Sequence, residues 1–301
     1  MCVIVLILYS LNNHFEKGHT DSIVAFLPAE IRSGFKADFR TLPHTLPGSR
    51  RRLVILVNSN WSNHHRRLAI RNTWASNQHR LNCSVFFVVG DSDDASIRHV
   101  SEEAAFFHDI IQPTVQDTEQ STVLKMLAAF RFVENELDSD FVMKTNDDVF
   151  VNLPALLEFL QPYSDGRDTA EYSRVDLPES GRPHRLIFGN RIPQTAQDQA
   201  LKHASLPDYA SGTSYVVSFD VVRRLNVCPS AVDLVPFEDV YFTGLCREHF
   251  GLVLEHDDRF AQNPRLNLPC LWKTKFITTR VKHSEMERVW NTANKKATPK
   301  C

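Results

Sequence analysis

Two adjacent carboxylates and an amide stand at the end of an apolar stretch, at Asn146, Asp147 and Asp148. Burying like charges side by side costs free energy unless a cation or hydrogen-bond donors stabilise them. A divalent metal that carries a phosphate group is a common partner for such an acidic pair. The same residues also fit a plain strand-to-helix turn, in which Asn152 caps a helix and Pro154 occupies its first turn.

A second charged group, which includes Arg67 and Arg71, follows the first apolar strand of the chain. The two arginines are four residues apart and share one face of a predicted helix. Guanidinium groups at a strand end can pair with phosphates in a bidentate manner. A solvated basic helix face is the alternative interpretation.

A third group is Glu238 and Asp239, with apolar neighbours at Val235, Phe237 and Val240. Carboxylates in the first turn of a helix complement its dipole, so capping alone explains them. Partial burial among apolar neighbours would raise the pKa of such an acid and suit it to act as a general base.

The surrounding pattern predicts the elements that position these groups. Continuous apolar strands are expected at 53–57, 85–89, 110–111 and 141–143, with a further short strand at 215–218. Helices are expected at 64–74, 96–107 and 119–137, and from Pro236 to about Phe250. Strands that are apolar on both faces and alternate with helices predict an α/β fold, with a mainly parallel central sheet flanked by helices. Ligands in such sheets bind beyond the carboxyl ends of the strands, which is where the Asn146 group lies.

Composition bounds the class of protein. The chain has 301 residues, is 43% hydrophobic and carries a formal net charge of −2, so it can bury a full core and has no basic field for nucleic acid. Residues 1–11 form an apolar block too short to span a bilayer, and we interpret them as a partial signal-anchor or signal-like segment. Residues 12–50 are predicted to be a stem or linker, and residues 51–301 the catalytic domain.

The six cysteines have no CxxC spacing, so a zinc site is not expected. A cysteine at the last position, Cys301, makes more sense as a disulfide partner than as a free thiol, and Cys270 is its expected partner. Asn60 and Asn82 begin sequons that would accept glycans in a lumenal protein.

Taken in order, seven segments resemble the beta-1,3-galactosyltransferase and beta-1,3-N-acetylglucosaminyltransferase family, glycosyltransferase family 31. They are residues 66–74, 87–90, 109–111 with 124–125, 144–152, 209–218, 238–241 and 285–290. The resemblance covers about residues 50–301. It implies a GT-A type glycosyltransferase fold and a hexosyltransferase that moves a sugar from a UDP-sugar donor to a glycan acceptor with inversion. It also implies a type II anchor in the Golgi membrane through the N-terminus, with a lumenal catalytic domain.

The resemblance assigns roles to individual residues. Asp148 matches the family's metal-binding acid and would hold manganese or another divalent cation against the UDP diphosphate, with Asp147 and Asn146 positioning the ribose and the metal shell. Asp239 matches the general base, and Glu238 lies beside it in the substrate site. Arg67, Arg71 and Lys125 are candidates for nucleotide contacts. Gly212 lies where the family shapes the sugar pocket, in a sequence closer to that of galactosyl-transferring members.

The chain departs from the family pattern at three positions. Asn146 replaces the first of three acids, and Thr279 replaces a histidine that is thought to bind the metal; His283 lies four residues on. Gly244 falls one residue later than in the commonest spacing. The leading hypothesis is a beta-1,3-galactosyltransferase. The alternatives are a UDP-N-acetylglucosamine beta-1,3-transferase and a catalytically silent homologue that binds sugar or a partner transferase.

Overall fold

The protein is represented by a computed structural model that describes residues 36–43, 49–92, 94–119, 121–165, 182–193, 207–232, 234–262 and 269–294. The strands are β1 Phe39–Thr41, β2 Arg51–Ser59, β3 Cys83–Val89, β4 Ile110–Pro113, β5 Ser139–Asn146, β6 Phe150–Val151, β7 Leu186–Ile192, β8 Tyr209–Ser218, β9 Val253–His256 and β10 Ile277–Thr278. The α-helices are α2 His64–Asn72, α3 Asp94–Phe107, α4 Thr122–Glu136, α5 Leu153–Ser164, α6 Phe219–Val227, α7 Arg247–His249, α8 Pro269–Thr274 and α9 His283–Asn294. Shorter helical segments are the 3₁₀ turns η5 Cys228–Ser230 and η7 Asp258–Phe260, and the π-helix η6 Val240–Cys246.

The central sheet has the strand order β1-β4-β3-β2-β5-β8-β7-β9. Strands β4, β3, β2 and β5 are parallel, whereas β8 runs antiparallel to both β5 and β7. A separate two-stranded sheet pairs β10 with β6. The predicted α/β fold with a mainly parallel sheet is therefore confirmed.

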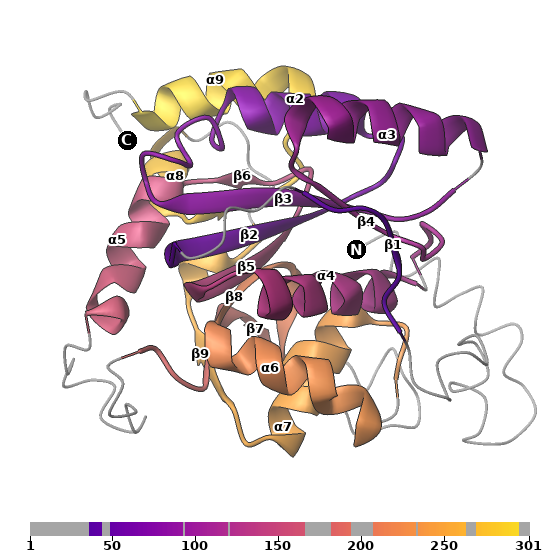
Figure 1. Cartoon of the computed structure of the whole chain (residues 1–301). Helices are drawn as coiled ribbons and strands as arrows, with labels where there is room; N and C mark the ends of the chain where they lie inside the picture. The colour runs from indigo at the N-terminus through magenta and orange to yellow at the C-terminus, as the bar shows by residue number, and fades with distance from the viewer. Residues whose placement is uncertain are drawn as a thin grey trace, which may run out of the picture.

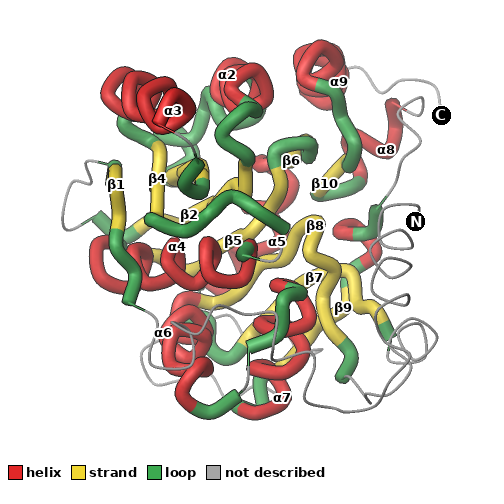
Figure 2. Tube along the Cα trace, turned by 90° about the vertical axis from the view of Figure 1, so that its right-hand side faces the viewer, coloured by secondary structure: helices red, strands yellow, loops and turns green. Residues whose placement is uncertain are grey.

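Helices cover both faces of this sheet (Figures 1 and 2). Helices α2, α3, α5 and α9 contribute to one buried cluster, and α4 and α6 to the other. Successive residues of β2 alternate between them, so that Ile55 packs in the first cluster and Leu56 in the second. A strand buried on both faces needs apolar residues at every position, which explains its unbroken apolar run.

The direction of β8 brings its first residues to the edge where β5 ends. In the register, Lys144 pairs with Tyr215 and Thr145 with Ser214. Because β8 is antiparallel to β5, the residues that precede Ser214 lie beyond the carboxyl end of β5. The segment around Gly212 is thereby placed next to the acidic strand end.

The expected strands are present with wider bounds, because backbone pairing extends strands past their apolar cores. The helices expected at 64–74 and 119–137 are shorter, as α2 and α4, and the helix expected from Pro236 to about Phe250 is the π-helix η6 followed by α7. The run at 53–57 is the centre of β2, and 215–218 is the second half of β8. Asn152 caps α5 by accepting a hydrogen bond from the Ala155 amide at 3.4 Å, so the acidic turn is a capped turn as well as a candidate site. Strand β1 arises within the range expected to be a stem, and pairs with β4 at the sheet edge.

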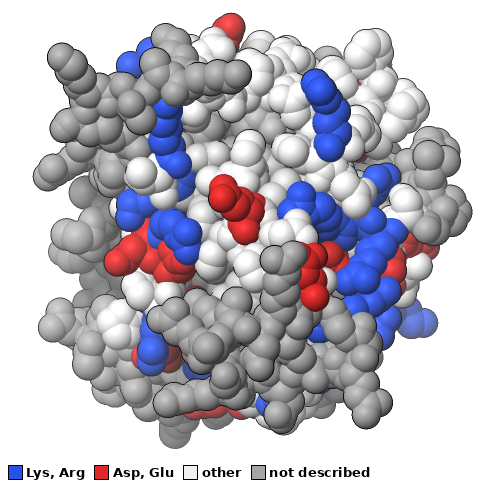
Figure 3. Space-filling model, turned by 90° about the vertical axis from the view of Figure 1, so that its left-hand side faces the viewer, with Lys and Arg blue, Asp and Glu red and all other residues white. Residues whose placement is uncertain are grey.

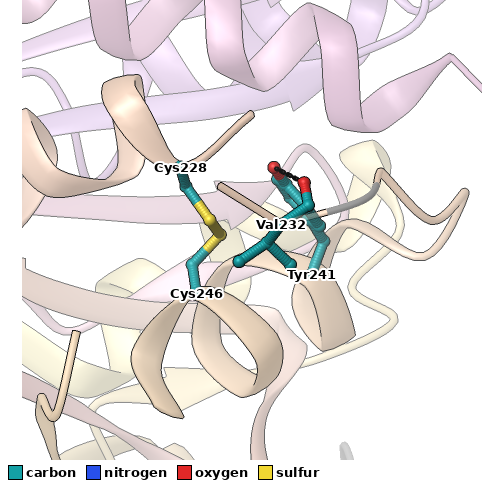
Figure 4. The surroundings of a disulfide bond; sticks show 4 residues. All are labelled: Cys228, Val232, Tyr241 and Cys246. Carbon is teal, nitrogen blue, oxygen red and sulfur yellow. Dashed lines mark hydrogen bonds between the residues drawn. A yellow bond between two sulfur atoms is a disulfide. The ribbon is translucent and has the colours of Figure 1, made fainter. Parts of the chain in front are cut away.

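A disulfide joins Cys228 to Cys246 and ties the end of α6 to η6 (Figure 4). Beside it the Tyr241 hydroxyl donates to the Val232 carbonyl at 3.3 Å. The pairing expected for Cys270 and Cys301 lies outside the described residues, as does the N-terminal segment 1–11. None of the helices in the described part of the chain is long and apolar enough to cross a membrane.

The face of the molecule at the left of Figure 1 carries basic and acidic side chains next to one another (Figure 3). Arg50 pairs with Asp140, and Arg182 with Asp138 at 2.9 Å. A hollow of about 440 Å³ beside Arg52 is lined partly by α5. Ion pairs between such neighbours offset part of the positive charge of the described residues on this face.

Candidate active site

Asp147 and Asp148 follow the last residue of β5, but their surroundings differ sharply. The Asp147 side chain is buried and accepts three hydrogen bonds: from the Ser59 hydroxyl at 2.7 Å, the Asn63 amide at 2.8 Å and the Arg66 guanidinium at 3.0 Å. These donors come from the end of β2 and from the first turns of α2. Asp147 therefore joins β5 to α2 through a charge-assisted network.

Asp148 is partly buried, and its carboxylate makes no side-chain hydrogen bond or ion pair with the described residues; its own backbone amide and the charges of Arg66 and Arg280 act on it. Burial raises the pKa of Asp148, and the neighbouring charge of Asp147 raises it further. Its backbone carbonyl accepts from the Val281 amide at 2.9 Å, which fixes the main chain at this point. The carboxylate is thus held in place by its backbone while its oxygens remain available to a cation.

Asn146 places a further oxygen at this strand end. Its Oδ1 atom is buried without a hydrogen-bond partner, and so is Oδ1 of Asn58, the residue paired with it in the β2–β5 register. A buried acceptor without a donor is unfavourable by about 1–3 kcal/mol. A bound cation or a ligand hydroxyl group would satisfy these two neighbouring acceptors.

Glu238 and Asp239 form the second acidic pair. Glu238 is buried; its Oε2 lies 2.9 Å from the Lys144 ammonium group, and its Oε1 accepts from the Tyr215 hydroxyl. Burial raises the pKa of Tyr215 well above its ordinary value, and the Glu238 charge adds to the rise. Both carboxylate oxygens of Glu238 are therefore occupied within the protein.

Asp239 is held by backbone donors instead. Its Oδ2 accepts from the Gly212 amide at 2.8 Å and its Oδ1 from the Val240 amide at 3.0 Å. Burial raises the pKa of this carboxyl group, with a further increase from Glu238. A Cβ atom at position 212 would lie 2.8 Å from Oδ2, so any other residue there would force the Asp239 side chain or the strand to shift. Asp239 is an oriented carboxylate with no cation paired to it in the described structure.

The helix after Asp239 is a π-helix over Val240–Cys246, with Asp239 as its N-cap. π-Turns take an extra residue, and they occur frequently at functional sites. The extra residue explains how Gly244 can fall one position later than the family spacing. A Cβ there would lie 3.3 Å from the Tyr209 Cβ, so Gly244 lets the start of β8 pack closely on η6.

Arg67 and Arg71 are engaged inside the protein. Arg67 is fully buried and binds both Glu103 oxygens at 2.7 and 2.9 Å. Its remaining contacts are the Ser59 hydroxyl and the carbonyls of residues 60 and 61. Arg71 binds Glu103 and Asp109, and stacks at 3.8 Å on the Phe107 ring. Both side chains shape the α2 region from within, and a direct phosphate contact stays a prediction.

Lys125 is also buried and paired. Its ammonium group binds Asp117 at 2.6 Å and the Ser59 carbonyl at 3.2 Å. Burial lowers the pKa of Lys125, and Asp117 opposes this effect. The contact with Ser59 places it under the end of β2, close to the donors of Asp147, and its nucleotide role likewise stays a prediction.

The position expected for a metal-binding histidine holds Thr279, which is buried. His283 is exposed at the start of α9, where its ring stacks on His65 at a centroid distance of 5.9 Å. The described residues contain no group of three or more His, Cys, Asp or Glu side chains that could hold a metal ion.

Sequence patterns do not identify Arg66 or Tyr215 as neighbours of the acidic groups. Arg66 alone among the α2 arginines reaches Asp147, because it lies on a different helical face from Arg67 and Arg71. Tyr215 lies in a predicted strand and in a segment that resembles the family, and its pairing with Lys144 across β5 and β8 places both beside Glu238. Strand register was the missing information in the second case.

Solved glycosyltransferase structures overlap with this chain only loosely. One from the glycosylation of the major capsid of PBCV-1 gives a TM-score of 0.42 at 9% identity, covering 80% of this chain and 98% of that one. The galactosyltransferase LgtC with donor and acceptor sugar analogues gives 0.40 at 11% identity, covering 82% and 98%.

Sequence relatives are more informative. The lactosylceramide 1,3-N-acetyl-beta-D-glucosaminyltransferase of Xenopus tropicalis is 28% identical over 256 residues, which cover 80% of this chain and 66% of the relative. Human beta-1,3-galactosyltransferase 1 is 28% identical over 254 residues, covering 83% and 76%. The chain thus spans just under two thirds of the length of the frog relative. The Galactosyltransferase family model matches residues 65–258, more than half of the chain, and the chain therefore belongs to the galactosyltransferase family.

Proposed function

We propose that this protein is an inverting beta-1,3-galactosyltransferase that moves galactose from UDP-galactose to the 3-hydroxyl of an acceptor sugar on a glycoprotein or glycolipid. The observation that carries the proposal is the state of Asp239. It is the member of its acidic pair that lacks a cationic partner in the described structure, and two backbone amides orient it at the sheet edge where β5 ends. Membership of the family supplies the reaction class.

Asp239 is the general base in this proposal. A base must have free lone pairs and a pKa that is raised toward the working pH. The pKa of Asp239 is raised by its burial and by Glu238, whereas the oxygens of Glu238 are taken by Lys144 and Tyr215. The two adjacent acids are thereby separated into one that accepts a proton and one that stays in an ion pair.

The reaction is a single displacement. As the acceptor oxygen forms its bond to the anomeric carbon, the bond from that carbon to the UDP oxygen breaks and UDP takes the bonding electrons. Asp239 removes the proton of the acceptor hydroxyl in the same step. One base suffices, and no nucleophilic side chain takes part.

A divalent cation, manganese by expectation, fits the other acidic pair only through Asp148. Asp147 is occupied by three donors, whereas Asp148 makes no side-chain hydrogen bond or ion pair with the described residues, and Oδ1 of Asn146, two residues before it, is buried without a hydrogen-bond partner. Oxygen ligands of this kind suit a hard divalent ion. When bound, such an ion neutralises charge on the departing diphosphate. Asn146 carries no charge, so we expect weaker metal binding than a third carboxylate would give.

In this proposal, the segment around Gly212 lines the sugar-binding site. Ser211 and Thr213 flank it, and the Gln262 amide donates to the Thr213 hydroxyl at 2.6 Å and to the Ser211 hydroxyl at 3.3 Å. Hydroxyl and amide groups close to the proposed base, Asp239, are suited to bind sugar hydroxyls. Transfer of N-acetylglucosamine is the second candidate, because the frog relatives are named for that donor.

We also propose that the protein acts in the Golgi lumen, anchored through residues outside the described part. This proposal rests on the family resemblance and on the apolar block at 1–11. The two sequon asparagines, Asn60 and Asn82, are half-buried, and a glycan on either would be consistent with a lumenal location.

A donor screen tests the proposed function. Purified protein would be incubated with manganese, a panel of acceptors ending in galactose, N-acetylglucosamine or N-acetylgalactosamine, and either UDP-galactose or UDP-N-acetylglucosamine. We expect acceptor-dependent release of UDP from UDP-galactose, with the product linkage assigned by NMR.

The outcomes separate the hypotheses. Release from UDP-N-acetylglucosamine alone would replace the donor and keep the reaction class. Absence of release with every pair, together with calorimetric binding of UDP or glycan, would support the catalytically silent homologue.

A further inference from the structure

Lys144 is a buried lysine whose ammonium group contacts one carboxylate and one backbone carbonyl oxygen. It lies on β5 with 3% of its surface exposed, where an unpaired ammonium group would be costly. Its first partner is Glu238 Oε2 at 2.9 Å, and its second is the Gly212 carbonyl oxygen. Neither partner is adjacent to it in the chain, so Lys144 joins β5 to the start of β8 and to the segment before η6.

The second contact reaches the base through the Gly212 backbone. The amide before the Gly212 α-carbon donates to Asp239 Oδ2 at 2.8 Å, while the carbonyl after it accepts from Lys144. Glycine rotates more freely about its backbone dihedral angles than any other residue. Holding both sides of Gly212 removes that freedom, and it fixes the direction in which the N–H group points at the carboxylate.

The first contact controls the charge near the base. Glu238 and Asp239 are neighbours in sequence, and Tyr215 donates to Glu238 from the opposite side. The charged side chains with the largest effect on Asp239 are Glu238 and Lys144, and Asp239 in turn acts on Tyr209 and Tyr215. Lys144 is the cation of this group in the described structure, so it offsets the charge of Glu238.

We propose that Lys144 is a positioning residue for the catalytic base: it holds the Gly212 carbonyl so that the Gly212 N–H orients Asp239, and it keeps Glu238 in a neutral pair. The proposal rests on the assignment of Asp239 as the base. Lys144 then acts without contacting the substrate. Glu238, predicted from the sequence as a substrate contact, is in this proposal the ion-pair partner of Lys144.

Two variants separate the two contributions. Lys144→Met removes the ammonium group and leaves Glu238 as an unpaired buried charge. Lys144→Met/Glu238→Gln removes both charges while keeping similar volumes, which is far less damaging to folding than breaking a buried pair. Asn226→Ala is the matched control, because it also removes a buried polar contact, the one to Glu134 at 2.7 Å, from a helix away from Gly212.

The expected results differ between the variants. In Lys144→Met the unpaired Glu238 charge raises the pKa of Asp239, so the acidic limb of kcat moves to higher pH. In the double variant the limb returns toward the wild-type position. Its kcat stays about 10- to 100-fold below wild type, with the donor KM little changed, because the Gly212 peptide is no longer held. Asn226→Ala keeps both kcat and the limb.

Wild-type kcat in the folded double variant would overturn the proposal, as would a crystal structure of that variant in which the Gly212 amide and the Asp239 carboxylate keep their positions. The crystal structure decides the question without any assay of activity. Asp239→Asn, measured alongside, tests the base itself. Full activity in that variant would remove the proposed function, whatever the result at Lys144.

Discussion

The two acidic pairs of this protein, Asp147–Asp148 and Glu238–Asp239, are built on the same plan. In each pair the first acid is buried and paired with a cation, Arg66 in one case and Lys144 in the other. In each pair the second acid has no cationic partner in the described structure, and its pKa is raised by burial and by the neighbouring charge. We therefore propose that one acid of each pair stabilises the fold and that the other takes part in the reaction.

The pairs differ in what orients the second acid. Asp239 receives one backbone N–H on each oxygen, which leaves it a directed proton acceptor. Among the described residues, the backbone donor to the Asp148 carboxylate is its own amide, and no neighbouring strand supplies a second one. A base must point at one proton, whereas a cation ligand needs accessible oxygens. The difference in donors therefore matches the difference in proposed role.

The largest effect on kcat should come from removing the carboxylates of the second pair, Glu238 and Asp239, one at a time. We expect Asp239→Asn to lower kcat by about 10³-fold, because proton removal in the transition state is lost. Glu238→Gln should lower kcat by only about 10-fold through displacement of neighbouring groups, and should reduce the melting temperature, because Lys144 loses its counter-charge. Steady-state kinetics and thermal unfolding of both variants would show this. Greater loss of kcat in Glu238→Gln would reverse our assignment of the base.

The same comparison in the first pair, Asp148→Asn against Asp147→Asn, tests the dependence of activity on manganese. Asp148→Asn should reduce kcat/KM for the UDP-sugar by on the order of 10²-fold at fixed manganese, because charge on the departing diphosphate is less well neutralised. Asp147→Asn should act mainly on stability, with a loss of about 1–3 kcal/mol as Ser59, Asn63 and Arg66 lose their acceptor. Activity would be titrated with manganese after treatment with a chelator. Equal manganese dependence in both variants would contradict a division of roles.

A smaller effect is expected from Gly212→Ala. The added Cβ would lie 2.8 Å from Asp239 Oδ2, so either the strand or the carboxylate must shift. We expect kcat to fall about 10-fold or more, with the donor KM little affected. Gly251→Ala provides the control, because it strains a surface turn at φ +58° and should lower stability but not kcat. Unchanged kcat in Gly212→Ala would show that the close contact does not orient the base.

The sequence predicted the sheet and the acidic strand end because both depend on local patterns. The apolar runs inside β2, β3 and β5 could be read without knowing their neighbours, and so could the capped turn at Asn152. Parallel strands buried on both faces then placed Asp148 at the ligand-binding edge. The prediction that this edge carries chemistry needed no long-range information.

Contacts between residues far apart in the chain could not be predicted from the local sequence pattern. Arg67 and Arg71 have the spacing of phosphate ligands, but Glu103 and Asp109, more than thirty residues away, occupy them. In the same way, nothing local distinguishes Glu238 from Asp239. The distinction arises from the register that places Lys144 and Tyr215 beside the first of them. The Cys228–Cys246 disulfide also depends on how α6 and η6 pack together.

The smallest expected effect is on stability, and it sharpens the comparison within the first pair. The raised folded-state pKa of Asp148 means that its proton favours the folded state, so its contribution to stability is present below the ordinary aspartate pKa. That contribution is lost as pH rises through the folded-state value. Asp148→Asn removes the ionisation, and without metal at neutral pH it should match or exceed wild type by less than about 1 kcal/mol.

Urea unfolding of wild type, Asp148→Asn and Asp147→Asn at pH 4 and pH 7 in the presence of a chelator would measure this. The difference between Asp148→Asn and wild type should grow from pH 4 to pH 7, whereas Asp147→Asn should be the least stable at pH 7. A loss in Asp148→Asn as large as that in Asp147→Asn would mean that the fold depends on the Asp148 charge. A carboxylate on which the fold depends could not be the one left free for a cation, because its oxygens would already be stabilising the protein.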